Sequence, residues 1–393
     1  MNRRTILSVS GGVLMMSVAG YSSVRDEEED TDGFEVEELE HGLSHPWGMA
    51  FLPDETQMLV TERDGHLSLL DRETGDLEEV DGMPELHVQH QGGLLDVTIH
   101  PDFSDEQWIY LTYSATNGDD ESATHVGRGQ LDLDEATLEE FEELHVAEPF
   151  TGSNFHFGSR VVFGEDGLLY MTTGDQDFKD FGPDHVSQDR SNELGATLRL
   201  EPDGSIPDDN PFVDEDDVAD AIYSYGHRNS QGMAVHPETG DIWQSEHGEE
   251  DGDEINIIEA GGNYGWPVAH YGCEYDTEEP IGDMPEERDD VVDPIYYWEC
   301  TSGGFPPSGT TFYNGDAFPE WQGDLFIGNL ADEYLGRFTV DGADDEDIAV
   351  EEAESLLDDR GWRIRDVEAA PDTGYLYVLV DQGNAPVVRL TPE

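Results

Sequence analysis

Lysine is nearly absent from this chain of 393 residues. Lys179 is the single lysine, and every other long basic side chain is an arginine. Lys and Arg together number 17 against 93 Asp and Glu, which gives a formal net charge of -76 at pH 7. Such a surface repels phosphate backbones, so nucleic acid is excluded as a partner. Beyond the N-terminal segment no apolar run is long enough to predict a membrane span. No long helical periodicity is present either, which argues against an α-helical fold.

Apolar and aromatic residues are not scarce, and they indicate that this acidic chain folds. They make up 36% of the sequence and include 7 Trp, 15 Tyr and 16 Phe, a content that disordered acidic chains lack. A dense negative coat destabilises the compact state through self-repulsion unless salt screens it. At 1 M salt the Debye length is roughly 3 Å, which removes most of that repulsion. The composition therefore predicts adaptation to multimolar salt, as in a halophilic archaeon.

The N-terminus predicts an export signal. Arg3 and Arg4 form a twin-arginine pattern and precede an apolar, glycine-broken run that is too short for a confident membrane span. We expect a signal segment over residues 1–23, an acidic linker over 24–40 and a single domain over 41–393. Export by this route would place the protein outside the cell or at the surface of a haloarchaeon.

Cys273 and Cys300 are the only two cysteines. In an exported protein they could form a disulfide that closes a loop of about 27 residues. Two free buried thiols are the alternative, and the sequence leaves both open.

A unit of two apolar, alternating runs joined by a Pro/Asp/Gly turn recurs along the chain and is typical of a β-hairpin. Six such units predict an all-β fold, a six-bladed β-propeller with long loops, in preference to a pair of β-sandwiches. Residues 135–143 could form a short helix or an acidic loop. The paired runs are 47–51 with 58–61, 95–100 with 109–112, 159–163 with 169–172, 232–236 with 242–245, 309–313 with 325–328, and 365–369 with 376–379.

Polar residues stand just before several of these repeated runs. In a propeller, the loops that enter the inner strands gather at one mouth of the central channel, so these side chains should converge although they lie far apart in sequence. The residues concerned are Gln91, His156, Arg228, Asn229, Arg363 and Arg365. Arginine binds carboxylates with two hydrogen bonds, so this set is suited to an anionic ligand.

Eight ordered segments from about Leu43 to the C-terminus carry a family resemblance. The chain resembles the soluble quinoprotein glucose/aldose sugar dehydrogenases, which use pyrroloquinoline quinone (PQQ) and calcium. The segments span residues 90–95, 156–160, 174–176, 203–212, 226–232, 253–256 with 262–267, 307–309, and 363–367.

The resemblance implies a hydride-transfer site. His156 matches the general base that takes the proton of the sugar's anomeric hydroxyl, a role that suits a neutral imidazole. Gln91 matches a side chain that positions the sugar. Arg228 and Asn229 match residues that contact the quinone oxygens, where a guanidinium stabilises developing negative charge. Arg363 and Arg365 lie two apart on an expected strand, so both should face one side and bind the cofactor's carboxylates.

The resemblance also implies two calcium ions. The backbone carbonyls of Gly248 and Glu249 match the ligands of the ion that bridges to the cofactor, although the family commonly has proline at the second position. Glu254 and Tyr264 match the ligands of a second, structural calcium. Carbonyl and carboxylate oxygens are the ligands that calcium prefers.

Two departures from the family pattern affect cofactor affinity and sugar preference. Some relatives supply a lysine to the cofactor near the fifth unit, whereas residues 329–332 contain none, and Lys179 is too distant in sequence to be assigned that place. Residues 299–305 also differ from the family pattern. The expected function is PQQ- and calcium-dependent oxidation of aldose sugars to lactones, with an external electron acceptor. The alternatives are a non-catalytic carbohydrate- or protein-binding propeller and a calcium-dependent propeller lactonase.

Overall fold

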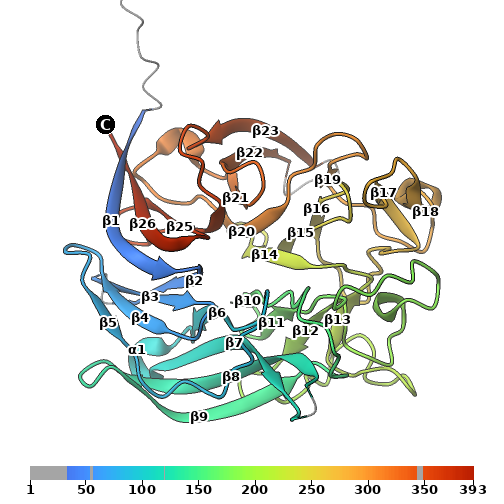
Figure 1. Ribbon diagram of the computed structural model, residues 1–393, viewed down its shortest axis with the longest axis horizontal. Helices are drawn as coiled ribbons and strands as arrows, with labels where there is room; N and C mark the ends of the chain where they lie inside the picture. The colour runs from blue at the N-terminus through green and yellow to red at the C-terminus, as the bar shows by residue number, and fades with distance from the viewer. Residues whose placement is uncertain (1–32, 54–55, 119, 343–347) are drawn as a thin grey trace, which may run out of the picture.

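The computed structural model describes residues 33–53, 56–118, 120–342 and 348–393, so the expected signal segment lies outside the described residues. Six four-stranded antiparallel sheets surround a central axis, which confirms the six-bladed propeller (Figure 1). Each of the six predicted hairpins forms the two inner strands of one blade.

The first three blades follow one another along the chain. Blade one contains β2 (Pro46–Phe51), β3 (Gln57–Glu62), β4 (Leu67–Asp71) and β5 (Leu77–Glu79). Blade two contains β6 (Leu94–Ile99), β7 (Trp108–Thr116), β8 (Ser122–Asp132) and β9 (Thr137–Val146), with the short helix α1 (Phe103–Glu106) between its first two strands. Blade three contains β10 (Val161–Phe163), β11 (Leu169–Thr172), β12 (Ala196–Leu200) and β13 (Ile222–Tyr225), with the 3-10 turn η1 (Val186–Gln188) in a long loop.

The last three blades include one insertion and one closure by the N-terminal strand. Blade four contains β14 (Ser230–Val235), β15 (Ile242–Glu246), β16 (Glu254–Ile257) and β19 (Tyr296–Tyr297). Its insertion holds β17 (Ala269–Cys273), β18 (Pro280–Gly282) and η2 (Pro285–Glu287). Blade five contains β20 (Pro307–Phe312), β21 (Leu325–Asn329), β22 (Leu335–Asp341) and β23 (Ala349–Leu356), with η3 (Pro319–Trp321). Blade six contains β24 (Ile364–Ala369), β25 (Leu376–Val380), β26 (Gly383–Pro392) and β1 (Phe34–Ser44).

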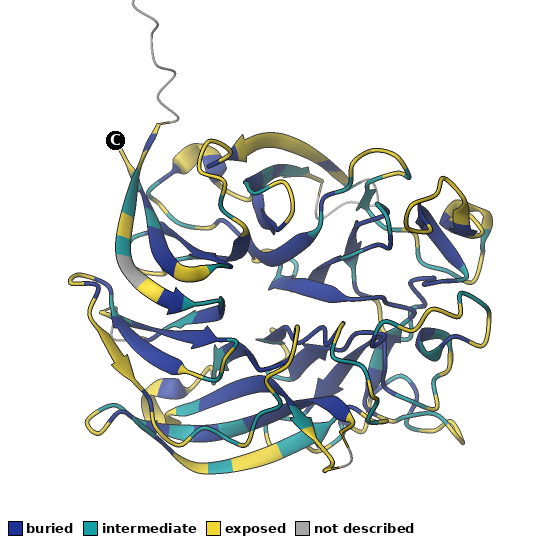
Figure 2. Ribbon diagram, in the orientation of Figure 1, coloured by how far each residue is buried: buried dark blue, intermediate teal, exposed yellow. Residues whose placement is uncertain are grey.

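The first strand of each blade lies at the centre, next to the first strands of the two neighbouring blades, and β24 contacts β2 to close the ring. Figure 2 shows these inner strands as largely buried and the outer strands as mixed or exposed. The apolar side chains pack mainly between adjacent blades. One cluster, for example, joins Val60 of blade one to Leu379 of blade six and Phe326 of blade five. Burial between blades therefore holds the ring together.

Strand β1 corrects the expected start of the domain. It pairs antiparallel with β26, placing Val36 opposite Leu390, so residues 34–40 belong to the last blade and not to a linker. Glu35 and Glu37 alternate with Phe34 and Val36 at the start of this strand, and the period of two puts the two apolar side chains on one face. The two ends of the chain therefore pair with each other, and β1 completes blade six as its outermost strand.

The segment over residues 135–143 is neither a helix nor a loop, so both expectations for it were wrong. Its residues form the turn before β9 and most of β9, which pairs with β8. As the outermost strand, β9 forms its backbone hydrogen bonds on one side and exposes many of its acidic side chains to water.

Cys273 and Cys300 form a disulfide with their Cα atoms 5.4 Å apart, which settles the open alternative in favour of pairing. Within the described residues, no helix has the length and apolar character needed to cross a membrane.

Candidate active site

The predicted base, His156, lies in the loop that leads into blade three and is held in place on two sides. Its Nδ1 is 2.7 Å from Oδ1 of Asp175, and its backbone N–H donates to Oε1 of Gln91 at 2.8 Å. The backbone of His156 has a φ of 52°, a conformation that non-glycine residues rarely adopt and that functional sites often retain. A Cβ at position 174 would overlap the His156 carbonyl, so Gly174 permits this close approach.

Asp175 orients the imidazole. Its carboxylate is almost fully buried, and it also accepts hydrogen bonds from Trp266 Nε1 at 2.8 Å and from the backbone N–H of Asp177 at 2.8 Å. Burial alone would raise the pKa of Asp175, but the hydrogen bond and charge of His156, together with Arg228, lower it. Because an ionised carboxylate can only accept, His156 carries its proton on Nδ1 and leaves Nε2 free to take one.

Arg228 and Asn229 lie beside this pair. The Arg228 guanidinium is buried, donates from Nη2 to Oε2 of Glu249 at 2.6 Å and stacks 5.3 Å from the ring of Trp266. Burial opposes its charge, but Asp175 and Glu249 raise the pKa of Arg228. Asn229 Oδ1 accepts from the N–H of Gly158, which anchors the loop that carries His156.

Arg363 and Arg365 both point toward Asp381, although Arg363 stands just before β24 and not within it. The Arg365 Nη2 is 2.8 Å from Oδ2 of Asp381, and the Arg363 Nη2 is 3.8 Å from the same oxygen. Arg365 is buried and also donates to Oε1 of Gln231, whereas the Arg363 side chain is 45% exposed. The Nε of Arg365 is buried and has no hydrogen-bond partner among the described residues. An anionic ligand could use this donor, so the cluster fits a carboxylate-bearing cofactor.

The predicted calcium ligands divide into two groups. Gly248 and Glu249 line a cavity near Arg228. The Glu249 side chain also has a role of its own, because its carboxylate forms ion pairs with Arg228 and Lys179. Glu254 is buried, and its Oε1 and the Oδ1 of Asn256 have no hydrogen-bond partner among the described residues. Two unpartnered buried oxygens fit a cation. The hydroxyl of Tyr264 instead donates to the Ile257 carbonyl.

Within the described ranges, no group of three His, Cys, Asp or Glu residues is arranged to hold an ion.

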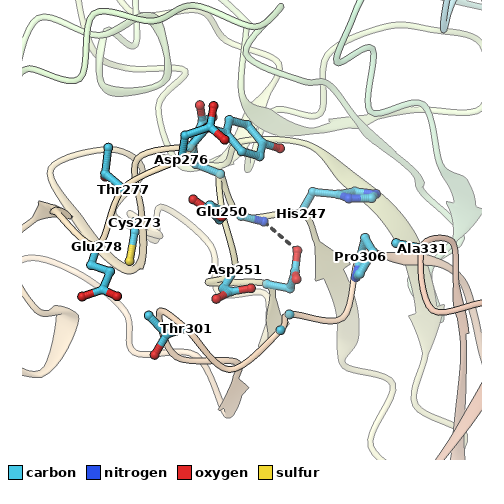
Figure 3. A pocket seen from close by; sticks show the side chains of 16 residues that line it. His247, Glu250, Asp251, Cys273, Asp276, Thr277, Glu278, Thr301, Pro306 and Ala331 are labelled. Atoms are coloured by element: carbon cyan, nitrogen blue, oxygen red, sulfur yellow. Dashed lines mark hydrogen bonds between the residues drawn. The ribbon is translucent and has the colours of Figure 1, made fainter.

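The cavity beside the arginines has a volume of about 1060 Å³. It is lined by the blade-four loop around Gly248, by the segments on either side of the disulfide, and by Pro306 and Ala331 of blade five. Figure 3 shows His247, Pro306 and Ala331 on one side and Thr277, Glu278 and Thr301 on the other. Burial and the nearby charges of Arg228 and Arg365 hold the pKa of His247 well below its usual range, so this ring is neutral.

Sequence reasoning assigned no role to Asp175, Asp381 or Lys179. Asp175 lies within one of the recognised segments, and its position nineteen residues after His156 puts it on the next loop of the same mouth. Asp381 follows β25, and in so acidic a chain nothing in the sequence around it indicated a role at the site. Lys179 was set aside for its distance along the sequence, yet its Nζ is 2.7 Å from Oε1 of Glu249.

The fold and site together define a six-bladed β-propeller with a histidine–aspartate pair and a cluster of cations at one mouth of its channel. Residues 43–389 match the family model described as Glucose / Sorbosone dehydrogenase, and the chain belongs to this family.

Named relatives and solved structures agree with this assignment. The chain is 39% identical to the aldose sugar dehydrogenase YliI of Escherichia coli over 91% of this chain and 92% of the relative. It is 29% identical to quinoprotein glucose dehydrogenase B of Acinetobacter calcoaceticus, over 89% and 86%. The apo-form crystal structure of the soluble E. coli aldose sugar dehydrogenase superposes with a TM-score of 0.83 at 40% identity, over 92% and 100%. The PQQ-bound aldose sugar dehydrogenase of Streptomyces coelicolor superposes with a TM-score of 0.72 at 26% identity, over 92% and 98%.

Proposed function

We propose that this member of the family oxidises the C1 hydroxyl of aldose sugars to lactones, using PQQ and calcium and passing electrons to an external acceptor. The observation that carries the proposal is the oriented base His156 beside the cationic cluster of Arg228, Arg363 and Arg365. The PQQ-bound structure of the Streptomyces coelicolor relative supports the choice of cofactor.

Each residue of the candidate site has its own role in the proposed oxidation. When bound, PQQ supplies an acceptor for the hydride that leaves the sugar C1. Asp175 keeps the His156 proton on Nδ1, so Nε2 takes the hydroxyl proton as the C–H bond breaks. Gln91 fixes the His156 backbone. Arg228 and Asn229 would hold the quinone end, Arg363 and Arg365 the carboxylates, and the carbonyls of Gly248 and Glu249 the calcium.

The two alternatives are less well supported by the side chains. A propeller lactonase typically binds its catalytic metal through carboxylate and Asn side chains in the channel, whereas this mouth presents a histidine and arginines. A pure binding propeller has no need for a base held in one tautomer by a buried carboxylate.

Reconstitution tests the proposal. Metal-stripped protein in 3 M KCl would receive calcium and PQQ singly and together, and sugar-dependent dye reduction would be followed with glucose and other aldoses. We expect turnover only with both additions. A folded protein that binds no PQQ would contradict the proposal, and PQQ binding without turnover of any aldose would contradict the substrate class.

We also propose that the protein works in multimolar salt, as the net charge of -76 suggests. The same reconstitution at about 0.1 M KCl, where the Debye length is about 10 Å, should give less folded and less active protein because the surface charges then repel one another. Circular dichroism at both salt concentrations separates loss of fold from loss of cofactor. Equal folding at both would contradict salt adaptation.

We propose export by the twin-arginine route, on the evidence of Arg3 and Arg4. Arg3→Lys/Arg4→Lys should leave the protein inside the cell, because that route requires the arginine pair. Cell fractionation with an antibody to the protein measures this. Secretion of the double variant at the normal level would exclude the route.

A further inference from the structure

The only lysine of the chain lies at the candidate site. Lys179 is on the long loop between β11 and β12, and its Nζ is 2.7 and 2.8 Å from the two carboxylate oxygens of Glu249. The same Nζ is 2.9 Å from Oδ1 of Asp177 and lies 5.4 Å from the ring centre of Tyr275. Every other long basic residue of this chain is an arginine, so position 179 is the one place where a side-chain ammonium group is kept.

Lys179 connects the base to the buried guanidinium. Asp177 Oδ1 is 3.7 Å from Nε2 of His156, and Glu249 Oε2 is 2.6 Å from Nη2 of Arg228. The charges therefore alternate in the order Asp177, Lys179, Glu249, Arg228, with the His156 ring next to Asp177. Lys179 is the most exposed member of this series, because its side chain is 46% exposed, compared with 35% for Asp177 and 4% for both Glu249 and Arg228.

The two carboxylates beside Lys179 present an electrostatic problem for an anionic ligand. A carboxylate approaching Arg228 meets the buried charge of Glu249, and one approaching His156 meets Asp177. Repulsion between like charges is strong where water is excluded. An ammonium has three donors on a flexible stem, so Lys179 can keep one donor on Glu249 and one on Asp177. The third donor, which meets the second Glu249 oxygen here, can turn to an incoming oxygen.

We propose that Lys179 is a cofactor-binding residue of this chain: it offsets Glu249 and Asp177 and binds a carboxylate of the anionic quinone. This inference rests on the proposed function. It assigns to the third blade a cofactor contact that sequence distance had argued against. The cavity lined by Glu249 and Tyr275, both in contact with Lys179, is where the ligand would meet the ammonium.

A single lysine makes the test direct, because an amine-reactive ester can acetylate only Lys179 and the N-terminal amine. The acetylation rate of each site would be measured by peptide mass spectrometry in 3 M KCl, with and without PQQ plus calcium. We expect PQQ to slow acetylation of Lys179 by at least about tenfold and to leave the N-terminal amine unchanged. The readout is independent of turnover.

Binding of PQQ to variants gives the second readout. Lys179→Met should weaken PQQ binding about 10- to 100-fold, which is the effect of losing one hydrogen bond to a charged group. Lys179→Arg keeps the charge and should retain more affinity than the methionine variant. Arg288→Met removes a cation from a surface pair with Asp290 and should bind PQQ as the wild type does. Melting temperatures of the variants exclude a loss of fold.

The outcomes separate this inference from the proposed function. If the wild type binds PQQ while Lys179 stays fully reactive and Lys179→Met binds equally well, the role of Lys179 is wrong and the proposed function stands. If the folded wild type binds no PQQ, both are overturned.

Discussion

Replacing His156 by alanine is expected to lower aldose turnover by about 10²- to 10⁴-fold, the usual contribution of a positioned general base. The imidazole is the group whose Nε2 is free to accept a proton, because Asp175 fixes the proton on Nδ1. PQQ affinity should change little, since the residues proposed to hold the cofactor are Arg228, Asn229, Arg363 and Arg365. Steady-state dye reduction and a PQQ titration of the same preparation measure the two effects separately.

His156→Asn is the matched control for structure. Its amide can still donate to Asp175, which would otherwise lose a hydrogen bond while almost fully buried, but it cannot act as a base. We therefore expect the asparagine variant to melt closer to the wild type than the alanine variant does, and to be equally inactive. Wild-type turnover in a folded His156→Asn protein would remove His156 from the catalytic role.

The propeller was predictable because its inner strands carry a local signal. Each inner hairpin combines a period-two apolar pattern with a turn, and both features lie within about twenty residues of sequence. The pairing of β1 with β26 has no such local signal, because it joins Val36 near one end of the sequence to Leu390 near the other. In addition, β1 is as acidic as a linker. Strand β9 was missed for the same reason, because an outer strand that exposes acidic side chains matches the composition of a loop.

Within the site, the arginines and His156 were predictable and their carboxylate partners were not. In a chain with 93 acidic residues, one more aspartate carries little information, so neither Asp175 nor Asp381 stood out. Their roles depend on which loops meet at the mouth, and that follows only from the closed ring. Lys179 shows the opposite case, because its rarity was visible in the sequence and only its place in space was missing.

Arg160 occupies the centre of the ring and joins five of the six blades. Its Nη1 is 3.1 Å from Asp96 of blade two, and its Nη2 is 2.9 Å from Asp366 of blade six. Its Nε donates to the Gln231 carbonyl of blade four at 2.6 Å, and its guanidinium lies 4.4 Å from the ring centre of Trp47 of blade one. Arg160 itself precedes β10 of blade three. Burial opposes the charge, but Asp366 and Asp96 raise the pKa of Arg160.

Arg160→Met is expected to lower the free energy of unfolding by about 3–5 kcal/mol, because it leaves two buried carboxylates without their cation. Arg288→Met, which breaks a pair on the surface, should cost at most about 1 kcal/mol. Urea unfolding in 3 M KCl measures both. If Arg160→Met is too unstable to purify, Arg160→Met/Asp96→Asn/Asp366→Asn should recover soluble protein, since the two carboxylates that pair with Arg160 are then neutral amides.

The pH dependence of the Arg160→Met variant distinguishes lost charge from lost packing. Burial already raises the pKa of Asp96 and Asp366 in the folded protein, and Arg160 opposes that rise. Without Arg160 both pKa values rise further. A carboxyl group with a raised folded-state pKa contributes stability that is present below its unfolded pKa, near 4, and is lost as pH increases through the folded value. The variant should therefore lose stability more steeply than the wild type between pH 5 and pH 8. A deficit that is the same at both pH values would mean that Arg160 stabilises the ring through packing against Trp47 and not through its charge.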